Sequence, residues 1–118
     1  MLKNLFTRTV QLAEPFTTKT GAVITRYKQG GNVFSKVVYG SGDKFPQKVG
    51  IVSMERKIMQ DGSSLCYFTL KSPEGEILPN CTVFPSWLRS FMNGELTREQ
   101  LFFKAKIAQF FEGAINKL

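Results

Sequence analysis

Apolar and polar residues alternate over most of residues 22–84, and this period of two predicts a series of short β-strands. Glycine, proline and aspartate separate the strands. Gly30-Gly31 and Asp61-Gly62 are typical of tight hairpin turns, and Asp61-Gly62 favours a type I′ turn. We expect five strands that pair mostly antiparallel, as a meander. Their predicted ranges are Ala22–Lys28, Val33–Tyr39, Val49–Met59, Leu65–Lys71 and Ile77–Phe84.

Two segments do not follow this alternation. In the first twenty residues, Leu2, Leu5 and Phe6 fit either a short helical turn or an edge strand, and Glu14-Pro15 would interrupt either one. The stretch Gly40–Pro46 contains two glycines and a proline, so we expect a loop there.

The period changes to that of a helix after residue 84. A short helix is predicted to open at Pro85 or Ser86 and to end at Asn93-Gly94. Thr97-Arg98-Glu99-Gln100 has the form of a capping box, in which the first and last side chains satisfy each other's backbone N–H groups. A second helix is predicted to follow, to about Asn116.

The apolar residues of the second helix cover a much wider arc than the roughly 100° stripe that packing on one sheet needs. Either the short helix with Trp87 covers the surplus face, or that face meets a partner. We expect a homo-oligomer, because a small domain buries more surface by self-association. The residues expected at this contact are Phe103, Ile107, Phe110 and Phe111.

These elements predict a single α+β domain over residues 1–118. A five-stranded, mostly antiparallel twisted sheet fills a basic, β-rich part over residues 1–84. A short and a longer C-terminal helix pack on it from a helical part over residues 85–118. An OB-like small barrel with C-terminal helices is the alternative, because five short strands and a basic face also suit that fold.

Net positive charge is confined to the first half of the chain. Residues 1–57 contain ten Lys and Arg against three Asp and Glu, whereas residues 58–118 contain six of each, and the net charge is +7. Such a distribution favours a polyanionic partner. Aromatic residues alternate with the cations in the same half, and rings beside cations suit unstacked bases on a phosphate backbone. The expected binding residues are Arg26, Tyr27, Lys28, Lys36, Tyr39, Lys44, Phe45, Lys48, Arg56, Lys57 and Tyr67.

Residues suited to catalysis are scarce. The chain has no histidine, which is the usual general base and the commonest metal ligand. Cys66 and Cys81 alone cannot make a standard zinc site, and no phosphate-binding glycine motif is present. We therefore expect no enzyme activity, no metal and no cofactor. Two free thiols and no segment apolar enough for a signal peptide or a membrane span lead us to expect a cytoplasmic protein.

A stretch within residues 50–95 resembles the positive cofactor four family of single-stranded-DNA-binding coactivators, and more loosely the Whirly proteins. The resembling residues are Ser72-Pro73-Glu74-Gly75-Glu76-Ile77-Leu78-Pro79, then a strand, then Pro85-Ser86-Trp87-Leu88 at the start of a helix. The resemblance implies a curved sheet that precedes a helix, pairing of two copies, and single strands lying across basic, aromatic-bearing sheet surfaces. The longer second helix and the basic N-terminal hairpin depart from that pattern.

The sequence thus predicts a non-catalytic protein that binds single-stranded nucleic acid, DNA in preference to RNA, with little sequence specificity. A phage, plasmid or compact bacterial genome would suit so small a protein. The alternative is a small inhibitor or adaptor that docks on an acidic protein through the basic face or the apolar C-terminal helix. Mutation of exposed helix phenylalanines would then abolish function.

Overall fold

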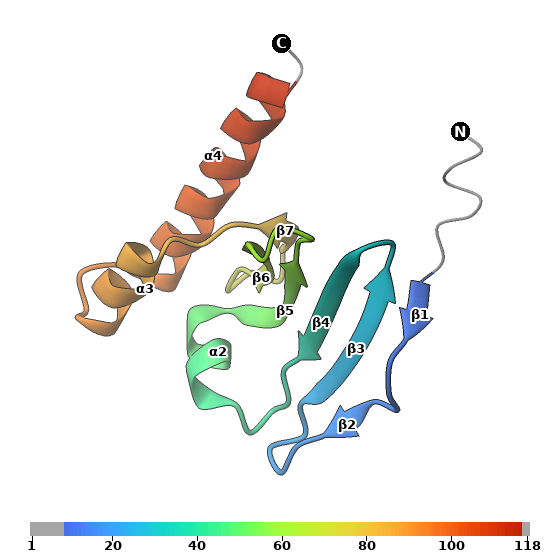
Figure 1. The fold of residues 1–118 in the computed structure, drawn as a ribbon. Coiled ribbons are helices and arrows are strands. Elements are labelled where there is room, and N and C mark those ends of the chain that lie inside the picture. Colours follow the sequence, from blue (N-terminus) through green and yellow to red (C-terminus); the bar gives the residue numbers. More distant parts are fainter. Residues whose placement is uncertain (1–8, 117–118) are drawn as a thin grey trace.

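Seven strands form one open antiparallel sheet in the computed structural model, which describes the backbone of residues 9–116 and the side chains of residues 9–109 (Figure 1). Along the sheet the order is β1-β3-β4-β5-β6-β7, and β2 also pairs with β3. The strands are β1 (Thr9–Gln11), β2 (Phe16–Thr17), β3 (Val23–Gln29), β4 (Asn32–Val38), β5 (Ile51–Ile58), β6 (Ser64–Lys71) and β7 (Ile77–Cys81). The helices are α2 (Lys44–Val49), α3 (Pro85–Met92) and α4 (Arg98–Asn116).

The prediction of an antiparallel meander with two C-terminal helices is confirmed, but the number of strands is wrong. The five expected strands correspond to β3–β7, and β1 and β2 add to the free edge of β3. These two strands are only three and two residues long, too short to show a period of their own. The OB-like alternative is also wrong, because β1 and β7 end an open sheet rather than closing a barrel.

The turn between β5 and β6 differs in type from the prediction. Asp61-Gly62 does form a hairpin, but its loop has three residues, bounded by a hydrogen bond from the Met59 N–H to the Ser63 carbonyl (2.8 Å). Only Gly62 has a positive φ, of 89°. A three-residue loop with glycine in the left-handed region is the next commonest hairpin connection after the two-residue turns.

The segment between β4 and β5 is a correction to the predicted loop and to the predicted start of the next strand. Lys44–Val49 is a short helix that ends at Gly50, whose φ is 90°. Pro46 lies in its first turn, where a missing N–H costs no intrahelical hydrogen bond. Asp43, just before the helix, accepts hydrogen bonds from the Gly40 N–H (2.7 Å) and the Thr20 hydroxyl (2.6 Å).

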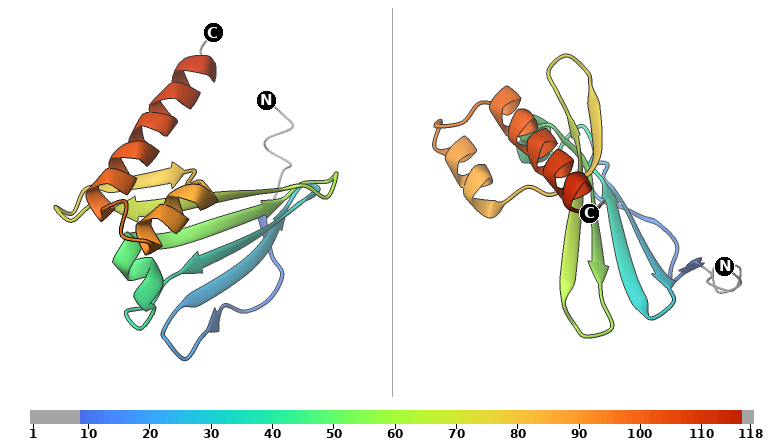
Figure 2. Two further views of the ribbon diagram at one scale, coloured as in Figure 1. Left: turned by 90° about the vertical axis from the view of Figure 1, so that its left-hand side faces the viewer. Right: turned by 90° about the horizontal axis from the view of Figure 1, so that it is seen from above.

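The main core lies where α3 and α4 pack on one face of the sheet, over β5–β7 (Figure 2). We call this face the helical face and the other the helix-free face, since none of the described helices lies on it. From α4, Leu101 and Ala105 are completely buried. The buried members of the core are Val49, Ile51, Leu70, Leu78, Cys81, Val83, Leu101, Phe102 and Ala105.

The capping box that fixes the start of α4 is confirmed. The Thr97 hydroxyl accepts a hydrogen bond from the Gln100 N–H (3.2 Å), and the Thr97 N–H donates to the Gln100 side-chain oxygen (2.9 Å). Further along, the Gln109 amide donates to the carbonyl of Pro79 (2.7 Å), and Lys106 pairs with Glu76 (2.9 Å). The last two contacts hold α4 along β7, the edge strand, as far as Gln109.

Because Leu101 is completely buried, we predict that Leu101→Ala lowers the free energy of unfolding by about 2–5 kcal/mol, through reduced burial and the cavity left behind. Leu12→Ala is the matched control, since that side chain is 52% exposed, and we expect a change of about 0.5 kcal/mol or less. Urea unfolding followed by circular dichroism measures both. Equal decreases in the two variants would contradict the described packing of α4.

Candidate nucleic-acid interface

A row of four side chains crosses the helix-free face from β3 to β6. The register places Tyr27 opposite Phe34, Phe34 opposite Lys57, and Lys57 opposite Leu65. The Tyr27 and Phe34 rings stack with centroids 4.9 Å apart and 6° between their planes, and the Lys57 Nζ lies 5.0 Å from the Phe34 centroid. Phe34 is only 6% exposed, although no described helix lies on this face. The row is thus a small second cluster centred on Phe34, with the Tyr27 ring on the neighbouring strand β3 and the Lys57 ammonium on the neighbouring strand β5.

A second row lies beside the first on the same face. Lys36 is opposite Glu55, and Glu55 is opposite Tyr67. Lys36 is exposed, whereas Glu55 and Tyr67 are half-buried. The two rows therefore bring together four of the expected binding residues, which are Tyr27, Lys36, Lys57 and Tyr67.

Glu55 is the one acidic side chain in these two rows, and it affects the neighbouring phenol. The pKa of Tyr27 is raised above its ordinary value, first because partial burial disfavours the charged phenolate and then because the Glu55 carboxylate is close. Both effects favour the neutral phenol over the phenolate. Lys36 and Lys57 leave the two rows with a net charge of +1.

Three other expected residues project from the helical face, at its open end over β3–β5. Strand alternation predicts this separation, and it is confirmed: Arg26 and Lys28 lie on the face opposite Tyr27, and Arg56 on the face opposite Lys57. Arg26 and Arg56 flank Ser35 on neighbouring strands, and all three cations are exposed. The strand residues on this face of β3–β6 include no acid.

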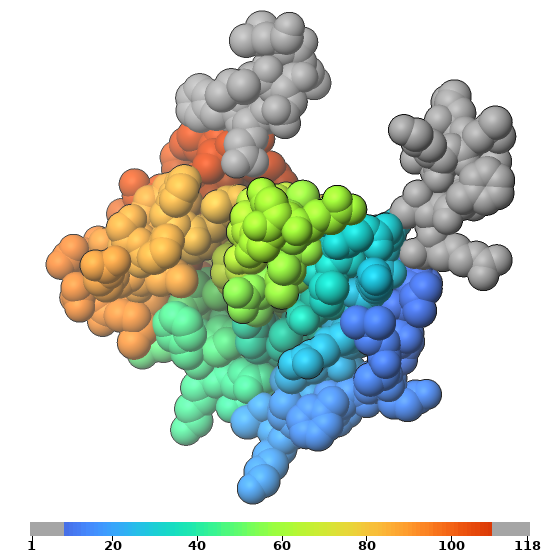
Figure 3. Space-filling model, viewed as in Figure 1, coloured from blue at the N-terminus to red at the C-terminus, as the bar shows by residue number. Residues whose placement is uncertain are grey.

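The remaining expected residues lie apart from both rows. Lys44, Phe45 and Lys48 belong to α2, and in Figure 3 strands β3 and β4 lie open between α2 and the N-terminal strands. Tyr39 follows β4 and packs against the main core. Burial, and secondarily Asp43, raises the pKa of Tyr39. It is therefore placed as a core residue at the base of the sheet rather than as a free stacking ring.

Three residues of the rows were not among the expected binding residues, namely Phe34, Glu55 and Leu65. Phe34 could have been found, because the two-residue turn at Gly30-Gly31 pairs Gln29 with Asn32 and so puts Phe34 opposite Tyr27. No comparable signal exists for Glu55, since α2 separates β4 from β5 and the length of such a connection does not set the register.

No protein-family model, curated protein or solved structure was found to match the chain. The resemblance of residues 50–95 to the positive cofactor four family therefore stays a prediction. Within the described residues, no group of three or more histidine, cysteine or acidic side chains is placed to hold a metal ion. None of the described helices has the length and apolar character needed to cross a membrane.

Because Glu55 contributes to the raised pKa of Tyr27, we predict that Glu55→Gln lowers that pKa. It should remain above the ordinary tyrosine value, because burial persists in the variant. A pH titration followed by NMR of ¹³C-labelled tyrosine rings measures the shift. Glu74→Gln, in the exposed turn after β6, is the control and should leave Tyr27 unchanged; an unchanged pKa in Glu55→Gln as well would rule out the proposed influence of Glu55.

Proposed function

We propose that this protein binds single-stranded nucleic acid, DNA in preference to RNA, along the helix-free face and without catalysis. The observation that carries the proposal is the grouping of Tyr27, Lys36, Lys57 and Tyr67 on one face that no described helix covers. Rings and cations on adjacent positions are what a flexible strand requires, since bases stack on rings while phosphates meet cations.

The packing of the rows supports different roles for the rings. The Phe34 ring stacks against Tyr27, and the Lys57 ammonium also lies over this ring. Because Phe34 is buried by these contacts, we assign it the role of supporting its neighbours rather than contacting bases. Tyr27, half-buried beside Gln11 of β1, is assigned the stacking role at this end of the site. Tyr67 has no aromatic partner among the described residues, and we assign it the stacking role at the other end of the site.

Charge sets the expected strength and specificity of binding. Two lysines neutralise phosphates, while Glu55 between Lys36 and Tyr67 repels them, so the backbone should follow the lysines and leave Glu55 to base amino groups. The remaining cations of the basic half would attract the strand at longer range. Stacking on the two tyrosines and neutralisation by the two lysines accept any base, which favours binding with little sequence preference.

The opposite cationic group, Arg26 with Lys28 and Arg56, offers a direct test of which face binds. We predict that Lys36→Gln/Lys57→Gln reduces the dependence of log affinity on log salt by about 0.7 for each phosphate that is no longer neutralised. The matched pair Arg26→Gln/Arg56→Gln removes as much charge from the other face and should change the slope little. Fluorescence anisotropy with a labelled single strand of ~30 nucleotides at several salt concentrations, beside the matching duplex, measures this.

The duplex should bind more weakly than the single strand, because its bases are already stacked and paired. If the arginine pair has the larger effect, the site is on the helical face. If wild-type protein binds neither strand nor duplex at low salt, the proposed function is wrong.

We predict separately that Tyr67→Leu weakens binding by roughly 1–3 kcal/mol, the value of stacking one base on one ring. Tyr67→Phe keeps the ring and removes only the hydroxyl, so its affinity should be close to that of the wild type. The same anisotropy titration compares the two variants, with circular dichroism as a check of folding. An equal weakening in Tyr67→Phe would assign the contribution to the hydroxyl rather than to stacking.

A further inference from the structure

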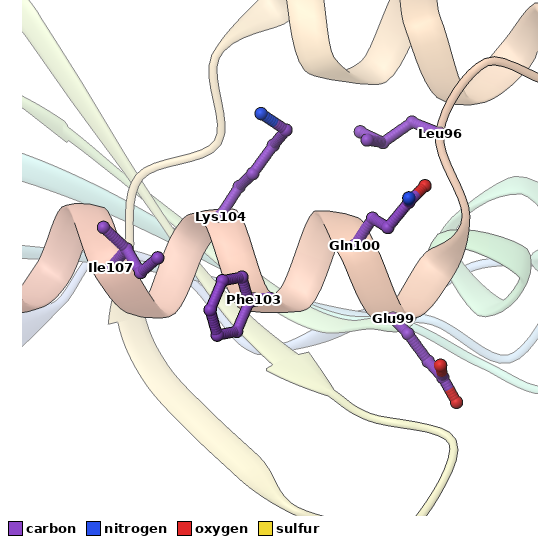
Figure 4. Close-up of a pocket in the computed structure, with 6 residues that line it drawn as sticks. All are labelled: Leu96, Glu99, Gln100, Phe103, Lys104 and Ile107. Atoms are coloured by element: carbon purple, nitrogen blue, oxygen red, sulfur yellow. The ribbon is translucent and has the colours of Figure 1, made fainter.

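A groove on the outer surface of α4, with a volume of about 520 Å³, is not used by the proposed function. Six residues line it, and Figure 4 shows them along one side of the helix and the loop before it. They are Leu96, Glu99, Gln100, Phe103, Lys104 and Ile107. Phe103 is 61% exposed and Ile107 is 39% exposed, so this is an uncovered apolar surface.

The groove and the main core lie on opposite sides of α4. Leu101, Phe102 and Ala105 face the sheet and are buried, and at 100° per residue the centre of the groove lies about half a turn away from them. The short helix α3 does not cover Phe103 and Ile107, which stay exposed, although the Lys104 ammonium lies 6.0 Å from the Trp87 ring centroid. The excess of apolar residues in α4 is therefore a second face, free to meet another surface.

The lining residues that belong to α4 have the spacing of a coiled-coil seam. Gln100, Phe103 and Ile107 follow one another at intervals of three and four residues, as a, d and a positions do, and Leu96 lies in the loop before the helix. Glu99 and Lys104 then take the flanking g and e positions, five residues apart. In a parallel pair of helices, a g residue of one helix meets the e residue five positions later in the other, so the acid of each copy faces the base of its partner.

From this complementarity we infer that the groove binds the same groove of a second copy of the chain, with the two α4 helices parallel about a two-fold axis. Phe103 and Ile107 pack in the seam, and Glu99 of each copy pairs with Lys104 of the other. A two-fold interface must be complementary to itself, and a surface with one acid and one base on either side of an apolar seam meets that condition. It suits neither a polyanion nor a partner of uniform charge.

The geometry of the chain permits this pairing. The groove faces away from the sheet, so two copies would be arranged as sheet, α4, α4 and sheet, without overlap of the two sheets. Gln100 marks the N-terminal end of the seam, where its side-chain oxygen accepts the Thr97 N–H in the capping box. Phe110 and Phe111, expected at the same contact, lie outside the described side chains and carry no part of the inference.

Sedimentation equilibrium of the full chain without nucleic acid tests the inference. We expect a dimer for the wild type. Glu99→Lys alone and Lys104→Glu alone should each raise the dissociation constant by at least about tenfold, because like charges then face each other across the seam. The double exchange Glu99→Lys/Lys104→Glu should restore it, since opposite charges meet again. Glu74→Lys makes the same change of charge in an exposed turn and should have no effect.

The inference is overturned if the wild type is monomeric at every concentration measured. It is also overturned if the single variants Glu99→Lys and Lys104→Glu dimerise as well as the wild type. Restoration by the double exchange excludes a simple decrease in helix stability as the cause, and also excludes an antiparallel pair, in which Glu99 and Lys104 lie on different flanks. Failure of the double exchange to restore pairing refutes the parallel arrangement. None of these measurements involves the helix-free face, so their outcome is independent of whether the proposed function is correct.

Discussion

The packing of α4 along β7, over the main core, is the interaction on which the rest of the structure depends. Leu101 and Ala105 of α4 belong to one cluster with Leu70 of β6 and Cys81 of β7, and all four are completely or almost completely buried. Deep burial raises the pKa of the Cys81 thiol to about 11, and its Sγ lies 3.0 Å from the carbonyl of Phe68. Because of this packing, the main core lies over β5–β7 on the helical face. The helix-free face and strands β1–β4 are left without a layer of described helices.

Strands outside the main core need another source of stability, and the helix-free face supplies it. Phe34 is buried by side chains of the sheet itself, through the stacked ring of Tyr27 and the cation of Lys57. Aromatic and cation–ring contacts between neighbouring strands contribute on the order of 0.5–1.5 kcal/mol each. The same contacts fix Tyr27 and Lys57, two of the four side chains that we propose for binding, so part of the site is held in place by the packing that stabilises these strands.

Part of the candidate site could be predicted from the sequence and part could not. Alternation along a strand placed Arg26 and Lys28 on the face opposite Tyr27, because side chains of adjacent residues project to opposite sides. The neighbours across β4 and β5 could not be predicted, because α2 separates these strands. Glu55 was therefore missed. Tyr39 was assigned to binding because it lies among the cations of the basic half, whereas the structure has it half-buried and packed against the main core.

The sequence by itself determined the order of β3–β7 and of the last two helices, and the capping box of α4, since these follow from local period, turn residues and side chains three positions apart. Only the tertiary structure decided the rest. The two shortest strands exist because β3 offers them an edge, and α2 forms where Val49 can reach the core. Which of the two apolar faces of α4 is buried was likewise open, because periodicity shows that two faces exist and only packing selects one.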